Sequence, residues 1–310
     1  MEEIRRYKIG ETGYPKRLEN IPDPPGELYV IGRLPEEERP AVAIVGAREC
    51  SEYGRFVARE LGGLLGRHGI SVISGMARGI DGISQAAALD GGGSSYGILG
   101  CGVDVCYPKE NKALYERLKT CGGILSEYAP GTRALAWNFP PRNRIVSGLA
   151  DVVVVIEARV KSGTLITVDM ALEQGKEVYV VPGRVTDRLS DGCNRLLKQG
   201  ANILLSPKEF MREITERGSR TDTGKSAGGE KRGADGGDFC GSAAENGKRL
   251  GKELKAVFEA LDYMPRSVEE IGRRLPEGYR NRLLVTYLME LCVEGMAVQV
   301  SPGSFARSSC

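Results

Sequence analysis

Short apolar runs rich in β-branched residues recur between residues 41 and 205, and they constrain the fold more than any other feature of the sequence. The clearest run is Val152–Ile156, which is built from valine and isoleucine alone. A strand that is apolar at every position must be buried on both faces, which is typical of a parallel sheet covered by helices. Similar runs occupy residues 41–45, 72–74, 96–99, 178–181 and 202–205.

Segments with helical periodicity separate these apolar runs. They cover residues 53–68, 80–89, 109–121, 164–174 and 194–199. Strands that alternate with helices form parallel βαβ units. The pattern therefore predicts an α/β fold with a doubly wound, Rossmann-like parallel sheet over residues 41–214.

The rest of the chain is predicted to form three further parts. Residues 1–40 surround one apolar run at 28–31 with prolines and turn residues, so we expect an extended lead-in that packs on the α/β domain. Residues 215–249 contain no Leu, Ile, Val or Met and cannot bury enough apolar surface to offset their ordering entropy, which predicts a flexible linker. Three helical stretches, a strand, a turn and a short end strand at residues 250–310 predict a small winged-helix domain.

Composition excludes several classes of protein. The 43 basic and 41 acidic side chains leave a formal charge of +2, so any nucleic-acid site must be a local basic patch. No run reaches the ~18 apolar residues of a spanning helix, and no secretory signal follows Met1, so we expect a cytoplasmic protein without a membrane segment. One histidine, His68, and eight cysteines without a C-x-x-C pair predict neither a metal centre nor a disulfide framework.

The loops that follow the predicted strands carry candidate binding groups. Ligands of an open parallel sheet bind beyond the carboxyl ends of its strands. Glycine lets the backbone approach a ligand, arginine suits phosphate, and the start of a helix favours an anion. We therefore expect an anion-binding edge, whose candidates are Arg48, Ser51, Gly75, Arg78, Gly79, Ser162, Gly163 and Thr164.

The segment from Phe139 to Gly148 suits a single nucleic-acid strand. It places an aromatic residue beside Arg142, Asn143 and Arg144, before an apolar helix. Bases stack on an aromatic ring while guanidinium groups meet the phosphates. The alternative interpretation is that Phe139 and Trp137 belong to the core and the arginines form a solvated face.

Two nucleotide-binding motifs are missing from the chain. The sequence G-x-G-x-x-G does not follow the first strand, and G-x-x-x-x-G-K-[ST] is absent, so neither a NAD or FAD site nor a P-loop is expected. We expect no cofactor. Three carboxylates, Asp81, Glu127 and Glu157, lie near the same loops, where a role as helix caps or ion-pair partners competes with a chemical one.

Several stretches make the chain resemble the DNA-processing protein A family, also called DprA or Smf. The resemblance covers roughly residues 14–205, and its stretches occur in family order. They are G-A-R-x-x-S-x-Y-G at 46–54, S-G-M-A-R-G-I-D at 74–81, G-x-G-x-D-x-x-Y-P at 100–108, S-E at 126–127, F-P-x-R-N-R-I-V-S-G-L at 139–149, S-G-T-L-I-T at 162–167, A-L-E-Q-G-K at 171–176 and V-P-G at 181–183.

The resemblance implies a function that the residues alone do not settle. Members are non-enzymatic proteins that bind single-stranded DNA, protect incoming strands in natural transformation, load the RecA recombinase and form homodimers. The strand-binding residues implied here are Arg48, Ser51, Gly75, Arg78, Gly79, Phe139, Arg142, Asn143, Arg144, Lys161, Ser162, Gly163 and Thr164. Two positions depart from the family pattern: Gln85 replaces a histidine, and Ala136 replaces a lysine for which Arg133 or Lys161 is the candidate substitute.

Two other functions remain open from the sequence. One is a nucleotide phosphoribohydrolase-like enzyme, although the loop at 162–164 lacks the P-G-G of such enzymes and Glu173 lies nine residues after Thr164, where their motif expects three. The other is a sequence-specific DNA regulator that uses the C-terminal domain. Residues 250–310 carry eight basic and eight acidic side chains, whereas a groove reader normally shows a basic footprint, so we expect this domain to add little DNA affinity.

Overall fold

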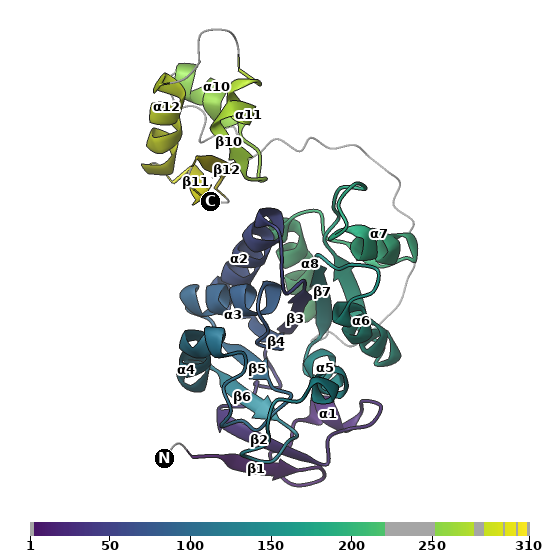
Figure 1. The fold of residues 1–310 in the computed structure, drawn as a ribbon. Helices are drawn as coiled ribbons and strands as arrows, with labels where there is room; N and C mark the ends of the chain where they lie inside the picture. The colour runs from purple at the N-terminus through teal and green to yellow at the C-terminus, as the bar shows by residue number, and fades with distance from the viewer. Residues whose placement is uncertain (1–2, 221–251, 276–281, 294, 302, 309–310) are drawn as a thin grey trace. The chain divides into compact units, whose positions relative to one another are not determined.

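The computed structural model describes residues 3–220, 252–275, 282–293, 295–301 and 303–308. The chain divides into two compact units, residues 1–222 and 223–310, and each is described by itself (Figure 1). Within the described residues, no helix combines the length and the apolar character needed to cross a membrane.

A nine-stranded sheet forms the centre of the first unit. Its strands are β1 (Arg5–Lys8), β2 (Glu27–Gly32), β3 (Ala41–Gly46), β4 (Ser71–Ser74), β5 (Ser95–Ile98), β6 (Gly123–Ser126), β7 (Val152–Ile156), β8 (Glu177–Val180) and β9 (Asn202–Ile203). They lie in the order β1-β2-β6-β5-β4-β3-β7-β8-β9. The strands from β6 to β9 in this order are parallel, and every residue of β7 is buried, as its apolar sequence requires.

Helices cover both faces of this sheet, which confirms the predicted doubly wound α/β fold (Figure 1). One face carries α2 (Glu52–Arg67), α3 (Ile80–Asp90) and α4 (Lys112–Cys121), with α2 packed closely against α3. The other face carries α1 (Lys16–Glu19), α5 (Phe139–Gly148) and α6 (Gly163–Glu173). The helix α7 (Asp191–Lys198) precedes β9 and packs on β8. The chain order reverses between β3 and β7, which is the switch point of the sheet.

The N-terminal lead-in is part of the sheet and not only an extended segment packed on it. The strands β1 and β2 pair antiparallel with each other, and β2 pairs antiparallel with β6. Leu28 and Val30 of β2 are fully buried in the core that also contains residues of β3, α5 and β7. The sheet is therefore mixed, and the prediction missed both this extension and β6, whose four residues include a glycine and a serine.

The helix α8 (Pro207–Arg220) extends past the expected domain boundary. The sequence placed the start of the linker at residue 215, but residues 215–220 are helical. An amphipathic helix whose apolar side already packs at Phe210, Met211 and Ile214 continues for another turn without further apolar residues. The rest of the predicted linker, up to residue 249, lies outside the described residues.

The second unit contains helices and a small antiparallel sheet. Its described elements are α10 (Lys252–Ala260), β10 (Arg266–Ser267), α11 (Val268–Gly272), α12 (Arg282–Val293), β11 (Ala297–Ser301) and β12 (Ser304–Arg307). The three strands lie in the order β10-β12-β11, over a core that includes Val257, Leu288 and Phe305. The assignment of this unit as a winged helix stays a prediction.

We predict that Leu28→Ala lowers the free energy of unfolding of the first unit by about 2–5 kcal/mol, because a fully buried leucine leaves a cavity. The control is Ile9→Ala, at a residue that is 42% exposed, which we expect to change stability by about 0.5 kcal/mol or less. Denaturant unfolding measures both. Equal effects would show that the lead-in is not part of the core.

Candidate nucleic-acid interface

A pocket of about 400 Å³ opens at the carboxyl edge of the sheet, where the loops after β3, β4 and β5 meet the start of α5. It lies on one side of the switch point, toward β5. Its lining combines aromatic, cationic and glycine residues: Arg48, Gly75, Ala77, Arg78, Leu99, Gly100, Tyr107, Pro108, Lys109, Glu110, Phe139 and Arg142. Five of the predicted site residues are therefore brought together.

Phe139 provides the apolar wall of the pocket. It begins α5, and its partly exposed ring lies 5.3 Å from the ring of Tyr107, measured between centroids. The guanidinium carbons of Arg48 and Arg142 lie 6.0 and 5.8 Å from the Phe139 centroid. A side chain at Gly100 would meet the Phe139 ring at 2.9 Å, so this glycine makes room for the aromatic residue. The interpretation of Phe139 as a core residue is therefore wrong, since its ring lines an open pocket.

Arg142 lines the pocket and bonds to two of the segments that form it. Its side chain is buried, and its Nη1 donates to the carbonyl oxygens of Gly75, at 2.9 Å, and Ile98. Burial lowers the pKa of Arg142 to about 10, and the neighbouring Asp81 opposes this shift, so the guanidinium stays charged at neutral pH. Burial likewise raises the pKa of Asp81, against the effect of Arg142. Arg142 is thus a structural cation that also faces the ring.

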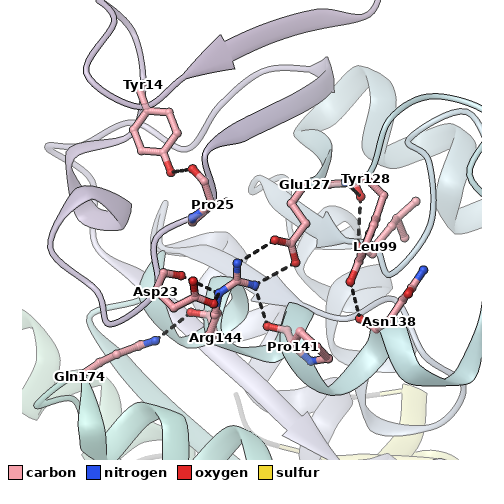
Figure 2. A network of polar contacts seen from close by, with 11 residues as sticks. Tyr14, Asp23, Pro25, Leu99, Glu127, Tyr128, Asn138, Pro141, Arg144 and Gln174 are labelled. Atoms are coloured by element: carbon pink, nitrogen blue, oxygen red, sulfur yellow. Dashed lines mark hydrogen bonds and ion pairs between the residues drawn. The ribbon is translucent and has the colours of Figure 1, made fainter.

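Arg144 is not available to a ligand, although the sequence made it a candidate phosphate contact. Its Nη1 and Nη2 donate to the two Glu127 oxygens at 2.8 and 2.7 Å (Figure 2). Its Nε donates to the Asp23 carbonyl oxygen at 2.7 Å, and Nη1 also donates to the Pro141 carbonyl oxygen at 2.8 Å. Only 8% of the residue is exposed. The network shown in Figure 2 ties α5 to the N-terminal lead-in, so a phosphate would have to break it.

Three cations at the pocket remain open to solvent. Arg48, Arg78 and Lys109 are exposed, and their side chains form no ion pair or hydrogen bond within the described part of the chain. Lys109 and the aromatic Tyr107 were missed by the sequence analysis. The signal was present, because Tyr107 belongs to the stretch G-x-G-x-D-x-x-Y-P at 100–108 and Lys109 follows that stretch directly.

The other predicted site residues lie outside this pocket. Lys161, Ser162, Gly163 and Thr164 lie at or just before the start of α6 and do not line it. Asn143 is half-buried on α5. Ser51 caps α2, since its Oγ accepts from the Gly54 N–H at 3.2 Å. Of the loops after β3 and β7, only the first reaches the pocket.

Gly79 belongs to a second groove that adjoins the pocket. This groove, of about 470 Å³, runs between α2, α3 and α4 and shares Arg78 and Glu110 with the pocket. Its other charged residues are Arg55, Arg59, Asp90 and Arg117. Arg117 is paired with Asp90 at 2.7 Å and Arg55 with Glu52 at 3.5 Å, which leaves Arg59 and Arg78 as the cations of the groove without an ion pair in the described structure.

Trp137 is not a core residue, as the alternative interpretation had it. It lies two residues before Phe139 in the short helix Ala136–Asn138, and 71% of it is exposed. The adjacent Ala136, where the family pattern has a lysine, is exposed as well. Neither Arg133 nor Lys161 lines the pocket, so Lys109 is the lysine that the structure places there.

The buried and the exposed arginines should respond differently to substitution. We predict that Arg142→Ala lowers the free energy of unfolding by about 3–5 kcal/mol, because it leaves Asp81 and two carbonyl oxygens buried without their cation. Arg48→Ala should change it by about 0.5 kcal/mol or less, because the side chain is exposed. Thermal or denaturant unfolding of both variants checks this. A loss of stability in Arg48→Ala would contradict the assignment.

Comparisons with known proteins agree on one family. A family model for DNA recombination-mediator protein A matches residues 5–215. The DNA processing protein DprA of Streptococcus pneumoniae is 40% identical over 209 residues, which cover 67% of this chain and 73% of that protein. The protein Smf of Escherichia coli is 41% identical over 202 residues, or 65% and 54% of the two chains.

Solved structures show the same relationship. The crystal structure of DprA from Streptococcus pneumoniae aligns with a TM-score of 0.65 at 39% identity, over 68% of this chain and 74% of that one. DNA processing protein A from Helicobacter pylori, described for its single-stranded DNA binding mode, aligns with a TM-score of 0.63 at 29% identity, over 70% and 99%. With its mixed sheet, its glycine and arginine loops and its aromatic pocket, the chain belongs to the DNA recombination-mediator protein A family, whose members include DprA and Smf.

Proposed function

We propose that this chain binds single-stranded DNA in the pocket around Phe139 and acts as a recombination mediator. The observation that carries this proposal is a partly exposed aromatic ring, with the guanidinium groups of Arg48 and buried Arg142 about 6 Å from its centre and the exposed Lys109 in the same pocket. A base stacked on Phe139 keeps its phosphates within reach of these exposed cations. The related protein from Helicobacter pylori, described for its single-stranded DNA binding mode, supports the same assignment.

The shape of the pocket favours a single strand over a duplex. The Phe139 ring is only partly exposed and packs against Tyr107, so a base must leave its own stack to reach the ring. Every base has a π-face, and stacking therefore supports binding without strong sequence preference.

The finer parts of the function rest on the family resemblance. We propose that the chain protects incoming single strands, helps to load the RecA recombinase, forms a homodimer and works in the cytoplasm. The exposed apolar side chains of Ile203 and Leu205 lie on and beside β9, the edge strand of the sheet, and a second copy of the chain is the partner that we propose for this edge.

We also propose that the chain catalyses no reaction. The alternative, a nucleotide phosphoribohydrolase, would need the loop at 162–164 and Glu173 at a common site. Glu173 is exposed at the end of α6, and neither it nor that loop lines the pocket or the adjoining groove. The candidate carboxylates Asp81, Glu127 and Glu157 each have a structural partner, respectively the Gly75 N–H, Arg144 and Ser51.

Phe139 provides the direct test of stacking. We predict that Phe139→Ala weakens binding of an oligo-dT strand by about 1–3 kcal/mol, while Phe139→Tyr, which keeps the ring, binds within about twofold of wild type. Fluorescence anisotropy with labelled oligo-dT measures both. Phe139→Ala with unchanged affinity would remove the ring from the interface and contradict the proposed function.

Salt dependence tests the cations. Arg48, Arg78 and Lys109 are three exposed candidates for phosphate contacts, and each contact to a single strand contributes about −0.7 to the slope of log affinity against log salt. We expect a slope of about −2, flattened by about 0.7 in Arg48→Ala and in Lys109→Ala. The control is Lys161→Ala, a lysine outside the pocket, which should leave the slope unchanged. A salt-independent affinity would show that these cations do not meet phosphates.

A further inference from the structure

A buried carboxylate occupies the switch point of the sheet. Glu157 follows β7 directly and faces the loop after β3, on the neighbouring parallel strand. Only 3% of Glu157 is exposed, and its φ of 56° lies in the left-handed region that residues other than glycine rarely adopt. A strained backbone and a buried charge both cost free energy, so local contacts must hold Glu157 in place.

Those contacts come from the start of α2. The backbone N–H of Ser51 donates to Oε2 of Glu157 at 2.9 Å, and the Ser51 hydroxyl donates to Oε1. A side chain on Gly54 would meet Oε2 at 2.4 Å, so the carboxylate lies directly against the first turn of this helix. Glu157 has no ion pair within the described residues, and its charge is therefore compensated by the backbone and the hydroxyl group.

This is the position that a phosphate takes in nucleotide-binding proteins of similar fold. There, the start of the helix after the first strand binds the anion with free N–H groups and the positive end of its dipole, at the switch point of the sheet. In this chain, α2 has 16 residues and begins at the same place. Glu157, just after the adjacent strand β7, already accepts the hydrogen bonds that Ser51 donates.

The same contacts fix the loop that carries Arg48. At one end of the loop, Ser51 is bonded to Glu157. At the other, the Ile80 N–H donates to the Ala47 carbonyl oxygen at 3.2 Å, and Gly79 lies so close that a Cβ there would meet this oxygen at 2.2 Å. Arg48 lies between these two anchors and faces the Phe139 ring.

We propose that Glu157 is a built-in anion that closes the phosphate site of the fold and, through Ser51, positions Arg48 at the pocket. It is a positioning residue that excludes nucleoside phosphates from the switch point, and it leaves the pocket toward β5 as the place where a strand can bind. The effect on Arg48 rests on the proposed DNA binding, whereas the closure of the phosphate site does not.

The closure is tested with inorganic phosphate on the full chain. Glu157→Ala should acquire a saturable, phosphate-dependent rise in melting temperature at constant ionic strength, and formate should also stabilise it by replacing the missing carboxylate. Wild type, Glu157→Gln, which still fills the site, and Glu173→Ala, which removes an exposed carboxylate, should show no such response. No response of Glu157→Ala to either anion would overturn the closure.

The positioning role is tested by a double-mutant cycle on oligo-dT affinity. Glu157→Ala should weaken binding roughly five- to tenfold in the wild-type background and under twofold in Arg48→Ala, because the two residues act through one loop. Formate should restore most of the loss. Equal losses in both backgrounds would overturn the positioning role.

A second, milder substitution tests the positioning role if the first variant does not fold. If Glu157→Ala does not fold, Ser51→Ala removes one of the two hydrogen bonds to Glu157 and should show the same coupling to Arg48 with a smaller loss. Wild-type protein that failed to bind oligo-dT would contradict the proposed function while leaving the phosphate experiment unaffected.

Discussion

The buried guanidinium of Arg142 is the interaction on which the binding edge depends. It joins the carbonyl oxygen of Gly75, just after β4, to that of Ile98, at the end of β5, and it lies beside Asp81 at the start of α3. One side chain from α5 thus ties together two segments that are distant in sequence, residues 75–81 and the end of β5. Without this cation, two buried carbonyl oxygens would lose a donor and the buried Asp81 would lose its neighbouring positive charge, which costs more than the bonds themselves provide.

At this edge of the sheet, some arginines are buried and stabilise the fold, whereas other cationic side chains are exposed and available to a ligand. Arg142 and Arg144 satisfy buried acceptors on opposite sides of α5, whereas Arg48, Arg78 and Lys109 stay exposed around Phe139. The exposed cations stay hydrated in the free protein and become desolvated only when a polyanion binds. A ligand with regularly spaced negative charges and flat apolar groups, such as a single strand, matches both the open cations and the ring.

The pocket also lies away from the usual phosphate position of the fold. A protein carboxylate stands at the start of α2, and the exposed cations of the pocket lie on the loops after β3, β4 and β5. The doubly wound fold is typical of nucleotide-binding enzymes, and in this chain it presents a pocket with an aromatic wall at the carboxyl edge of the sheet.

The sequence by itself determined the α/β class, the parallel strands and the motifs of the edge, because apolar runs and glycine-arginine loops are local patterns that survive without tertiary contacts. Only the tertiary structure decided which charges are free. Arg142 and Arg144 look alike in the sequence at 139–148, yet both are buried because Gly75, Ile98 and Glu127 arrive from distant segments. The strand β1 was hidden for the same reason, since its charged residues form an edge strand only where β2 offers a partner.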